Sequence, residues 1–339
     1  MISKSILWTL CVLLCGTAFG RGVEVSRAPY GVAASGEHVD VFTLRNDKGM
    51  VVRVLTYGGT ITEISMPDRH GSFANVVLSL PDLKAYETRA NFSSLLGRYA
   101  NRIAEGGFTL DGVRYNLPSN AQGISSHGGP NAFSTKVWRA KPLKTGVELT
   151  YVSADGENGY PGKLSVSVAY LLTDVFKIRY TARTDKPTVV NLSHHVYFNL
   201  AGSGTIQGQS LQVFADQYTP FDARKIPTGQ IDSVAGTELD FRAPTVLGDR
   251  LVDHNFVLGD PRCGGTLRLA ARLTDPGSGR NLVVVTTQPG IQVFTGRPGG
   301  VALETQHFPN SPNQPTFPST VLRPGQVFSE ETEYRFGAD

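Results

Sequence analysis

The sequence predicts an all-β protein, built as one large antiparallel β-sandwich. Three observations support this fold class. Segments rich in β-branched and aromatic residues recur along most of the chain, and several alternate between apolar and polar residues. Gly, Pro, Asn or Asp interrupts them at intervals of about 8–12 residues, the spacing typical of sandwiches and barrels. The 37 glycines and 20 prolines fit many turns and few helices.

The individual elements follow from local patterns. Residues 108–115 predict a β-hairpin, because Asp111-Gly112 at its centre supplies the positive φ of a type I′ turn. The best helix candidate is the short run 81–86, with Pro81 in the first turn, where a missing N–H is tolerated. The segments with strand character are residues 51–57, 164–172, 175–181, 211–215, 267–273 and 282–287.

The chain shows no fixed-period repeat and no low-complexity linker after its first 20 residues. Residues 308–318 are rich in Pro and Asn, but strand-like sequence resumes at Val321, so we expect a long surface loop there. Residues 21–339 are therefore predicted to form a single β-sandwich domain.

The N-terminus has the pattern of a secretory signal peptide at residues 1–20. Lys4 precedes an apolar run at 6–15, and small residues follow, which places the expected cut near residues 18–20. The run is too short to span a membrane, which takes about 20 apolar residues. The alternatives are a buried N-terminal strand or a signal anchor. We expect an exported protein, periplasmic or extracellular, with no membrane association once the signal is removed.

Composition limits the classes of partner. Cleavage would remove Cys11 and Cys15 and leave Cys263, which cannot form an internal disulfide alone. Lys and Arg total 32 against 29 Asp and Glu, and no run of basic residues or basic-aromatic interleaving appears. This argues against nucleic acid and membrane surfaces as partners. A small, uncharged ligand is expected; the oligomeric state is undefined, with a monomer as the expectation.

No metal or cofactor site is predicted. His194 and His195 are adjacent, so on a strand they point to opposite faces and cannot both bind one ion. A metal site would need His127 and carboxylates from distant segments. The glycine-rich runs at 202–208 and 296–300 lack the spacing of dinucleotide or phosphate loops and are predicted to be turns.

The segment 191–200 is the first candidate for chemistry. Period-two alternation puts His195 and Tyr197 on one face of a strand, with His194 on the other. A titratable imidazole beside a phenol suits sugar hydroxyls and proton transfer. The alternative is a core histidine bound to a backbone carbonyl.

Glu304 is the second candidate, because it follows the apolar residues 301–303 directly. Burial of a carboxyl raises its pKa towards the range useful for a general base. The alternative is an exposed glutamate on an edge strand. Asn101-Arg102, His127 before two glycines, and Asp253 could grip a ligand or lie in ordinary surface loops.

Together these segments resemble the aldose 1-epimerase (galactose mutarotase) family. The resemblance covers about residues 39–336 and rests on motifs in a fixed order. They are Asn-Arg at 101–102, His-Gly-Gly at 127–129, Asn-Leu-Ser-x-His-x-Tyr-Phe-Asn-Leu at 191–200, Asp-His-Asn-Phe at 253–256, Thr-Gln-Pro-Gly-Ile-Gln-Val-Phe-Thr-Gly at 287–296 and Leu-Glu-Thr-Gln-His-x-Pro at 303–309.

The resemblance implies an enzyme that interconverts the α and β anomers of free aldoses such as glucose and galactose, without a cofactor. It implies the family's antiparallel supersandwich, with His195 as general acid and Glu304 as general base. The positions that match those holding sugar hydroxyls in the family are Asn101, Arg102, His127, Tyr197, Asp253 and Gln292.

Two other functions remain open from the residues alone. A non-catalytic carbohydrate-binding protein on the same fold would explain Arg102 and Asp253, but it has no need for His195 paired with Glu304. A glycosidase could use Asp253 and Glu304 as its two carboxylates, but it leaves His195 without a role.

Overall fold

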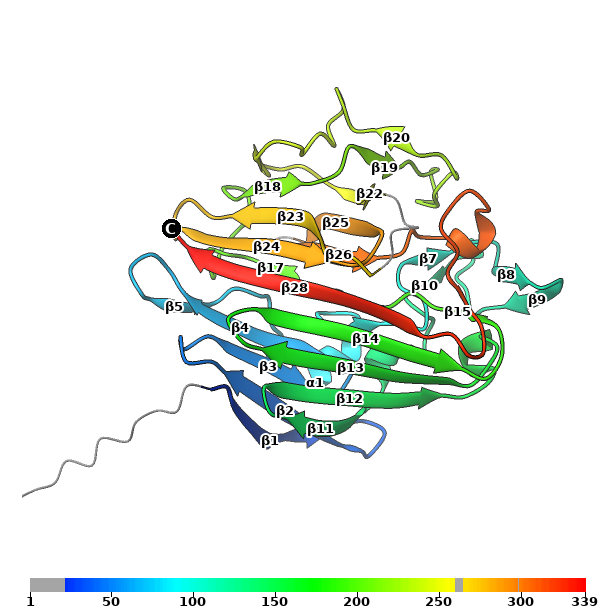
Figure 1. The fold of residues 1–339 in the computed structure, drawn as a ribbon, viewed down its shortest axis with the longest axis horizontal. Helices are drawn as coiled ribbons and strands as arrows, with labels where there is room; N and C mark the ends of the chain where they lie inside the picture. Colours follow the sequence, from blue (N-terminus) through cyan, green and yellow to red (C-terminus); the bar gives the residue numbers. More distant parts are fainter. Residues whose placement is uncertain (1–21, 260–264, 298) are drawn as a thin grey trace, which may run out of the picture.

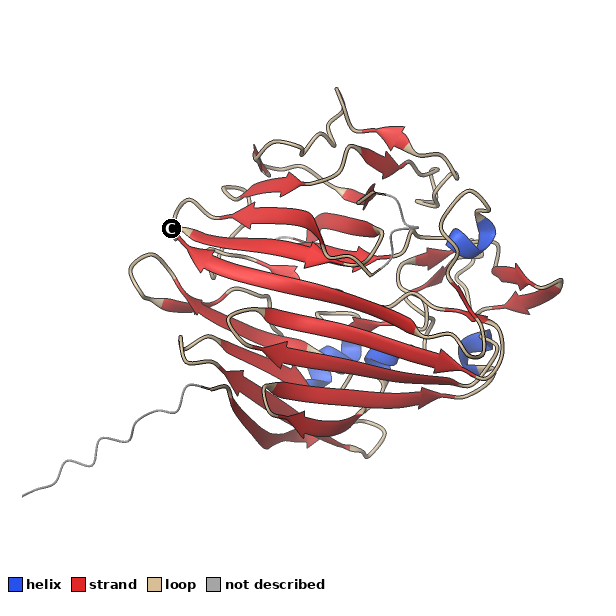
Figure 2. Ribbon diagram, in the orientation of Figure 1, coloured by secondary structure: helices blue, strands red, loops and turns tan. Residues whose placement is uncertain are grey.

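The computed structural model describes residues 22–259, 265–297 and 299–339. The predicted signal peptide and Cys263 lie outside the described residues. Strands predominate in the described part (Figure 2), where the one α-helix is α1 (Leu83–Thr88). No helix in these ranges is long and apolar enough to cross a membrane.

The largest sheet has nine strands, and Figure 1 shows it running across the molecule. All of its neighbouring strands are antiparallel, and β28 lies at its centre, between β14 and β24. In spatial order the strands are β11 (Arg139–Leu143), β12 (Gly146–Ser153), β13 (Leu164–Leu172), β14 (Phe176–Thr184), β28 (Phe328–Ala338), β24 (Arg280–Thr286), β23 (Arg268–Thr274), β18 (Ser210–Val213) and β21 (Thr245–Val246).

Two further antiparallel sheets lie behind it in Figure 1. The five-stranded sheet contains β1 (Glu24–Val32), β2 (His38–Arg45), β3 (Val51–Leu55), β4 (Ile61–Pro67) and β5 (Phe73–Asn75). The six-stranded sheet contains, in spatial order, β17 (Tyr197–Phe198), β26 (Gly300–Gln306), β25 (Gly290–Arg297), β22 (Asp253–Val257), β19 (Gln217–Thr219) and β20 (Asp232–Ser233). Short two-stranded pairs complete the fold: β6 (Leu95–Leu96) with β16 (Ser193–His194), β7 (Arg102–Ile103) with β10 (Ser125–Ser126), β8 (Gly107–Leu110) with β9 (Val113–Asn116), and β15 (Thr188–Val189) with β27 (Val321–Leu322).

One hydrophobic core joins the three large sheets. Its buried side chains include Val52 from the five-stranded sheet, Val168 and Val284 from the nine-stranded sheet, and Ile291 and Leu303 from the six-stranded sheet. Apolar faces of different sheets therefore pack on one another, as in a sandwich. The predicted all-β sandwich is confirmed.

The strand predictions hold to within a few residues. The segment 164–172 coincides with β13, whose side chains alternate between fully buried and more exposed positions. The Asp-Gly hairpin is also confirmed, because Leu110 pairs with Val113 and the φ angles of Asp111 and Gly112 are 51° and 80°.

Two other predictions need correction. The helix begins two residues later than predicted, because the Asp82 side chain caps it by accepting the Ala85 N–H at 2.8 Å, leaving Pro81 outside. Residues 308–318 are not a surface loop throughout. Phe308 and Phe317 pack edge to face, and Asn310 is buried before the 3-10 turn Ser311–Asn313.

Candidate active site

The candidate site lies on one face of the six-stranded sheet. Asn255 of β22, Gln292 of β25 and Glu304 of β26 are register partners, so they form a row across three adjacent strands. Side chains two residues apart on a strand lie on the same face. Asp253 on β22 and Phe294 on β25 therefore share this face with the row. Polar side chains from distant parts of the sequence thus converge on one surface.

Glu304 belongs to strand β26, which is buried on both faces. All seven residues of β26 are buried; Leu303 points into the main core, and the side chain of Glu304 on the opposite face is only 2% exposed. Its Oε2 has no hydrogen-bond partner among the described residues. The alternative of an exposed edge-strand glutamate is therefore wrong.

The two adjacent histidines point in opposite directions, as predicted. His194 lies in the core between two tyrosines, with Tyr170 Oη 2.8 Å from its Nε2 and Tyr180 Oη 2.9 Å from its Nδ1. Burial lowers its pKa to about 3, so it is a neutral structural residue. The main chain of His195 is fixed by hydrogen bonds with Ser93 and Ser94, which directs its ring to the other side.

His195 faces Glu304 across the site. Its Nε2 lies 3.5 Å from Glu304 Oε1, and its Nδ1 is buried without a hydrogen-bond partner in the described chain. The ring also contacts those of Tyr197 and His127, with centroid separations of 4.8 and 5.5 Å. Phe294 meets it edge-on at 6.1 Å. The histidine and the carboxyl are thus close enough to act on neighbouring atoms of one small molecule.

Burial acts on both members of this pair. It raises the pKa of Glu304 to about 8, with the Asp253 charge adding to the effect and Arg102 opposing it. It lowers the pKa of His195 to about 4. At neutral pH the free pair therefore holds one proton, and burial favours that proton on the carboxyl. The imidazolium–carboxylate form expected from the resemblance has the same number of protons and differs only in where this proton sits.

The raised pKa of Glu304 predicts a pH-dependent stabilisation by Glu304→Gln. Below about pH 4.5 the Glu304 carboxyl is protonated in both the folded and the unfolded protein, so its raised pKa does not lower the free energy of unfolding of the wild type. As pH rises to about 8 the unfolded chain releases this proton and the folded protein retains it, so wild-type stability falls. We expect the variant to have the higher Tm by several degrees at pH 8.5 and by much less at pH 5.

Thermal unfolding followed by circular dichroism measures this difference. Glu63→Gln serves as the matched control, because Glu63 is a partly exposed residue of β4 that pairs with Arg53 at 3.7 Å. A Tm difference that stays constant between pH 5 and 8.5 would contradict a raised pKa for Glu304.

Asp253 contacts three polar side chains at one end of the site. Its Oδ1 accepts a hydrogen bond of 2.7 Å from Gln292, and its Oδ2 lies 3.3 Å from Arg102 Nη2 and 2.8 Å from Lys225 Nζ. These three contacts fix the orientation of the carboxylate. A small polar pocket opens here, lined by Asn101, Arg102, Thr219, Phe221, Lys225, Pro227, Asp253, Asn255, Gln292 and Pro309.

Asn101 and His127 are held against each other by their main chains. His127 N donates to Asn101 O at 2.8 Å, and Asn101 N donates to His127 Nδ1 at 3.2 Å. Burial lowers the pKa of His127 well below 6.5, and the neighbouring His195 and Arg102 add to this, so its ring is neutral. Its Nε2 can then donate a hydrogen bond to a ligand.

Gly128, which follows His127, allows two stretches of main chain to approach each other closely. Gly128 has a φ of +92°, and an added Cβ would lie 2.1 Å from the carbonyl oxygen of Gly97. The close approach is therefore to the protein's own main chain and not to a ligand.

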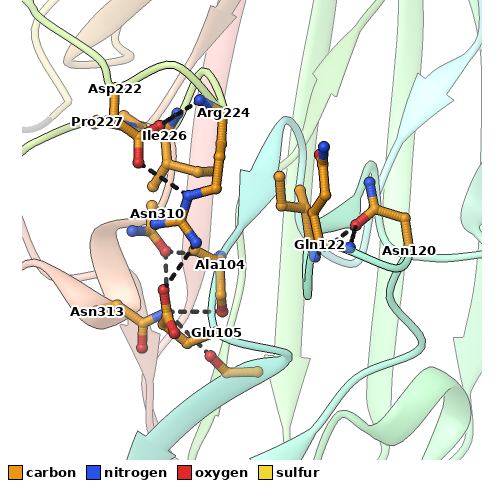
Figure 3. Close-up of polar contacts among 12 residues, drawn as sticks. Ala104, Glu105, Asn120, Gln122, Asp222, Arg224, Ile226, Pro227, Asn310 and Asn313 are labelled. Carbon is orange, nitrogen blue, oxygen red and sulfur yellow. Dashed lines mark hydrogen bonds and ion pairs between the residues drawn. The ribbon is translucent and has the colours of Figure 1, made fainter.

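Three segments that are distant in sequence meet around Ala104 and Glu105 (Figure 3). Asn310 Oδ1 accepts the Ala104 N–H at 3.0 Å, and the neighbouring Glu105 lies 3.4 Å from Arg224. Arg224 belongs to the loop that carries Lys225. These contacts hold that loop beside the strand that begins at Arg102.

All eight residues predicted for the site come together on this surface. His195, Tyr197, Glu304 and His127 surround one part of it, and Asn101, Arg102 and Gln292 gather around Asp253 in the other. Three further residues of this surface, Asn255, Phe294 and Lys225, were not predicted from the sequence. Strand register could have indicated the first two, since both share a face with Gln292, whereas no local pattern in the sequence indicates Lys225.

The chain is similar in sequence and structure to known proteins. The aldose 1-epimerase family model matches residues 40–335. Galactose mutarotase from Rattus norvegicus is 39% identical over 342 residues, covering 93% of this chain and 99% of the rat protein. Aldose 1-epimerase from Escherichia coli K12 is 35% identical, covering 91% and 98%. The crystal structure of galactose 1-epimerase from Lactobacillus acidophilus superposes with a TM-score of 0.80 at 28% identity, covering 93% and 99%. The chain belongs to the aldose 1-epimerase family.

Proposed function

We propose that this enzyme interconverts the α and β anomers of free, neutral aldoses such as galactose and glucose, with Glu304 and His195 moving the two protons. The observation that carries the proposal is the buried pair itself, whose Nε2 and Oε1 lie 3.5 Å apart beside a polar pocket. A sugar-binding protein has no need of such a pair.

Ring opening requires two proton transfers. Glu304 as carboxylate takes the proton from the hydroxyl on C1, and the bond between C1 and the ring oxygen breaks as the C1 carbonyl forms. His195 as imidazolium delivers a proton to the ring oxygen. The aldehyde then rotates about the C1–C2 bond and closes on its other face, with the two residues in reversed roles. Each residue regains its starting protonation state.

The proton on the free pair must reach His195 before this first step. Arg102 already acts to lower the pKa of Glu304. A hydrogen bond donated to Glu304 by a hydroxyl of the bound sugar favours the carboxylate further. Asp253 accepts hydrogen bonds from hydroxyls at the far end of the sugar. Its carboxylate is held in place by Gln292, Arg102 and Lys225. Positioning of this kind lowers the entropic part of the barrier.

Polarimetry of freshly dissolved α-D-galactose and α-D-glucose tests the function directly. Purified protein is expected to accelerate the approach to the equilibrium rotation over the spontaneous rate in the same buffer. Saturable sugar binding without acceleration would indicate a binding protein. Release of a free sugar from a glycoside would indicate a glycosidase.

Arg102→Ala is expected to raise KM for galactose at least as strongly as it lowers kcat. Arg102 is a hydrogen-bonding side chain that lies 3.3 Å from Asp253 and does not receive or deliver the transferred protons. Initial rates over a range of galactose concentrations separate the two constants. Arg183→Ala, which removes an exposed arginine on β14, is the control. A loss confined to kcat would contradict a binding role.

We also propose that the protein is exported, because Lys4 and the apolar run at 6–15 have the pattern of a signal peptide. N-terminal sequencing of protein from its native source should find a first residue between about Gly20 and Val23. An intact Met1 on the native protein would refute export and leave the enzymatic proposal unaffected.

A further inference from the structure

A second pocket lies next to the catalytic pair, beyond Tyr197. It has a volume of about 300 Å³ and is lined by residues 88–92, which begin at the last residue of α1, together with Tyr197 and Arg297. We call it the arginine pocket. Because the rings of Tyr197 and His195 are 4.8 Å apart, the arginine pocket continues the active site on the histidine side.

The polar groups of the arginine pocket are dominated by hydrogen-bond donors. Arg89 and Arg297 both line it, and none of its described lining residues is acidic. Neither arginine forms an ion pair with a carboxylate in the described part of the chain. The side-chain oxygen of Asn91 already accepts a hydrogen bond from Ser134, so its amide NH₂ is the group left to interact.

Arg297 is fixed in place by aromatic rings. Its guanidinium carbon lies 5.2 Å from the ring centre of Phe92 and 5.1 Å from that of Tyr197. Its Nε is buried and has no hydrogen-bond partner within the described ranges. Because the guanidinium covers these ring faces, the rings are less available for stacking on a second sugar. The guanidinium also hydrogen-bonds the Tyr197 hydroxyl, and its remaining N–H donors are the groups offered to a ligand such as a carboxylate.

Sugar geometry links this pocket to one substituent. In the proposed mechanism His195 meets the ring oxygen, and in a pyranose C6 is only two bonds from that oxygen. A group on C6 therefore leaves the ring on the His195 side, next to Tyr197. The hydroxyls on C2 to C4 lie further round the ring.

We propose that the arginine pocket binds an anionic group on C6 of the sugar, the carboxylate of a hexuronic acid, so that the enzyme also interconverts the anomers of uronic acids. This inference rests on the proposed mutarotase function. The reaction is the same proton transfer at C1 and the ring oxygen, and the carboxylate takes no part in it. A phosphate ester on C6 would present similar charge, so the two sources must be distinguished by experiment.

The test compares D-galacturonate, D-galactose 6-phosphate and D-galactose as substrates by polarimetry. Wild-type protein is expected to turn over galacturonate with a KM no higher than that for galactose. Arg297→Gln is expected to raise the ratio of KM for galacturonate to KM for galactose by about 10-fold or more, as loss of a charge-assisted hydrogen bond requires. Arg89→Gln should shift this ratio in the same direction.

Arg139→Gln is the matched control, because it removes an equal charge from an exposed position on β11 and should leave the ratio unchanged. An unchanged ratio in Arg297→Gln would overturn the proposal, as would a shift confined to the 6-phosphate. A shift for galacturonate supports it, whether or not the phosphate shares it. If wild type fails on galactose itself, the mutarotase function has failed instead.

Discussion

Glu304→Gln is expected to lower kcat for galactose mutarotation by at least about 100-fold, the usual effect of losing one general acid–base group. Glutamine keeps the shape of the side chain and its hydrogen bonding, but it cannot accept the proton from the C1 hydroxyl. In the proposed mechanism the sugar is held mainly by the groups around Asp253, so KM should change far less than kcat. Polarimetric initial rates at several galactose concentrations measure both constants.

Two comparisons make this result interpretable. Circular dichroism establishes that the variant is folded, and Glu63→Gln removes a carboxylate on β4 that belongs to no part of the site. Near wild-type kcat in a folded Glu304→Gln protein would show that Glu304 is not the base. The sugar-binding alternative would then become the better explanation.

His195→Asn is expected to lower kcat by a similar factor, about 100-fold or more. Asparagine is polar but cannot deliver a proton to the ring oxygen. In the proposed mechanism His195 and Glu304 carry out one reaction together. The double variant should therefore lose little more activity than the single variant with the lower kcat. If the two losses multiply, the residues act independently and the proposed unit is wrong.

The neighbouring histidine provides a matched control. His194→Asn makes the same substitution one residue away, where the ring bonds Tyr170 and Tyr180 in the core. We expect this substitution to lower Tm, because the buried hydroxyls of Tyr170 and Tyr180 lose their hydrogen-bond partner. Each loss lowers the free energy of unfolding by about 1–3 kcal/mol. Its kcat should stay within about threefold of wild type, since the ring faces away from the site.

The local features of the fold could be predicted because they depend on neighbours in sequence. Alternation of side chains defined β13 and separated His194 from His195, and the Asp111-Gly112 pair set the hairpin turn. The helix start was misplaced because a side-chain cap at Asp82 outweighed the position of Pro81. Residues 308–318 contain Pro and Asn, as surface loops do, yet tertiary contacts bury Phe308 and Asn310.

The site could be predicted only in part. The resemblance identified Glu304 and Gln292 singly, but their alignment across β26 and β25 depends on strand register, which a single segment does not contain. Lys225 reaches Asp253 from a loop 28 residues earlier in the chain. Arg297 becomes part of a pocket only because residues 88–92 pack beside its hairpin. Both depend on long-range packing.

The central position of β28 has a consequence for biosynthesis. This strand, Phe328–Ala338, separates β14 from β24 in the nine-stranded sheet. A ribosome makes β14 and β24 before β28, so each of these two strands lacks one of its partners until β28 has been made. Such unpaired edges can pair with other chains, and aggregation competes until the last strand is released. The wide sheet can close only after translation has reached the final residues of β28.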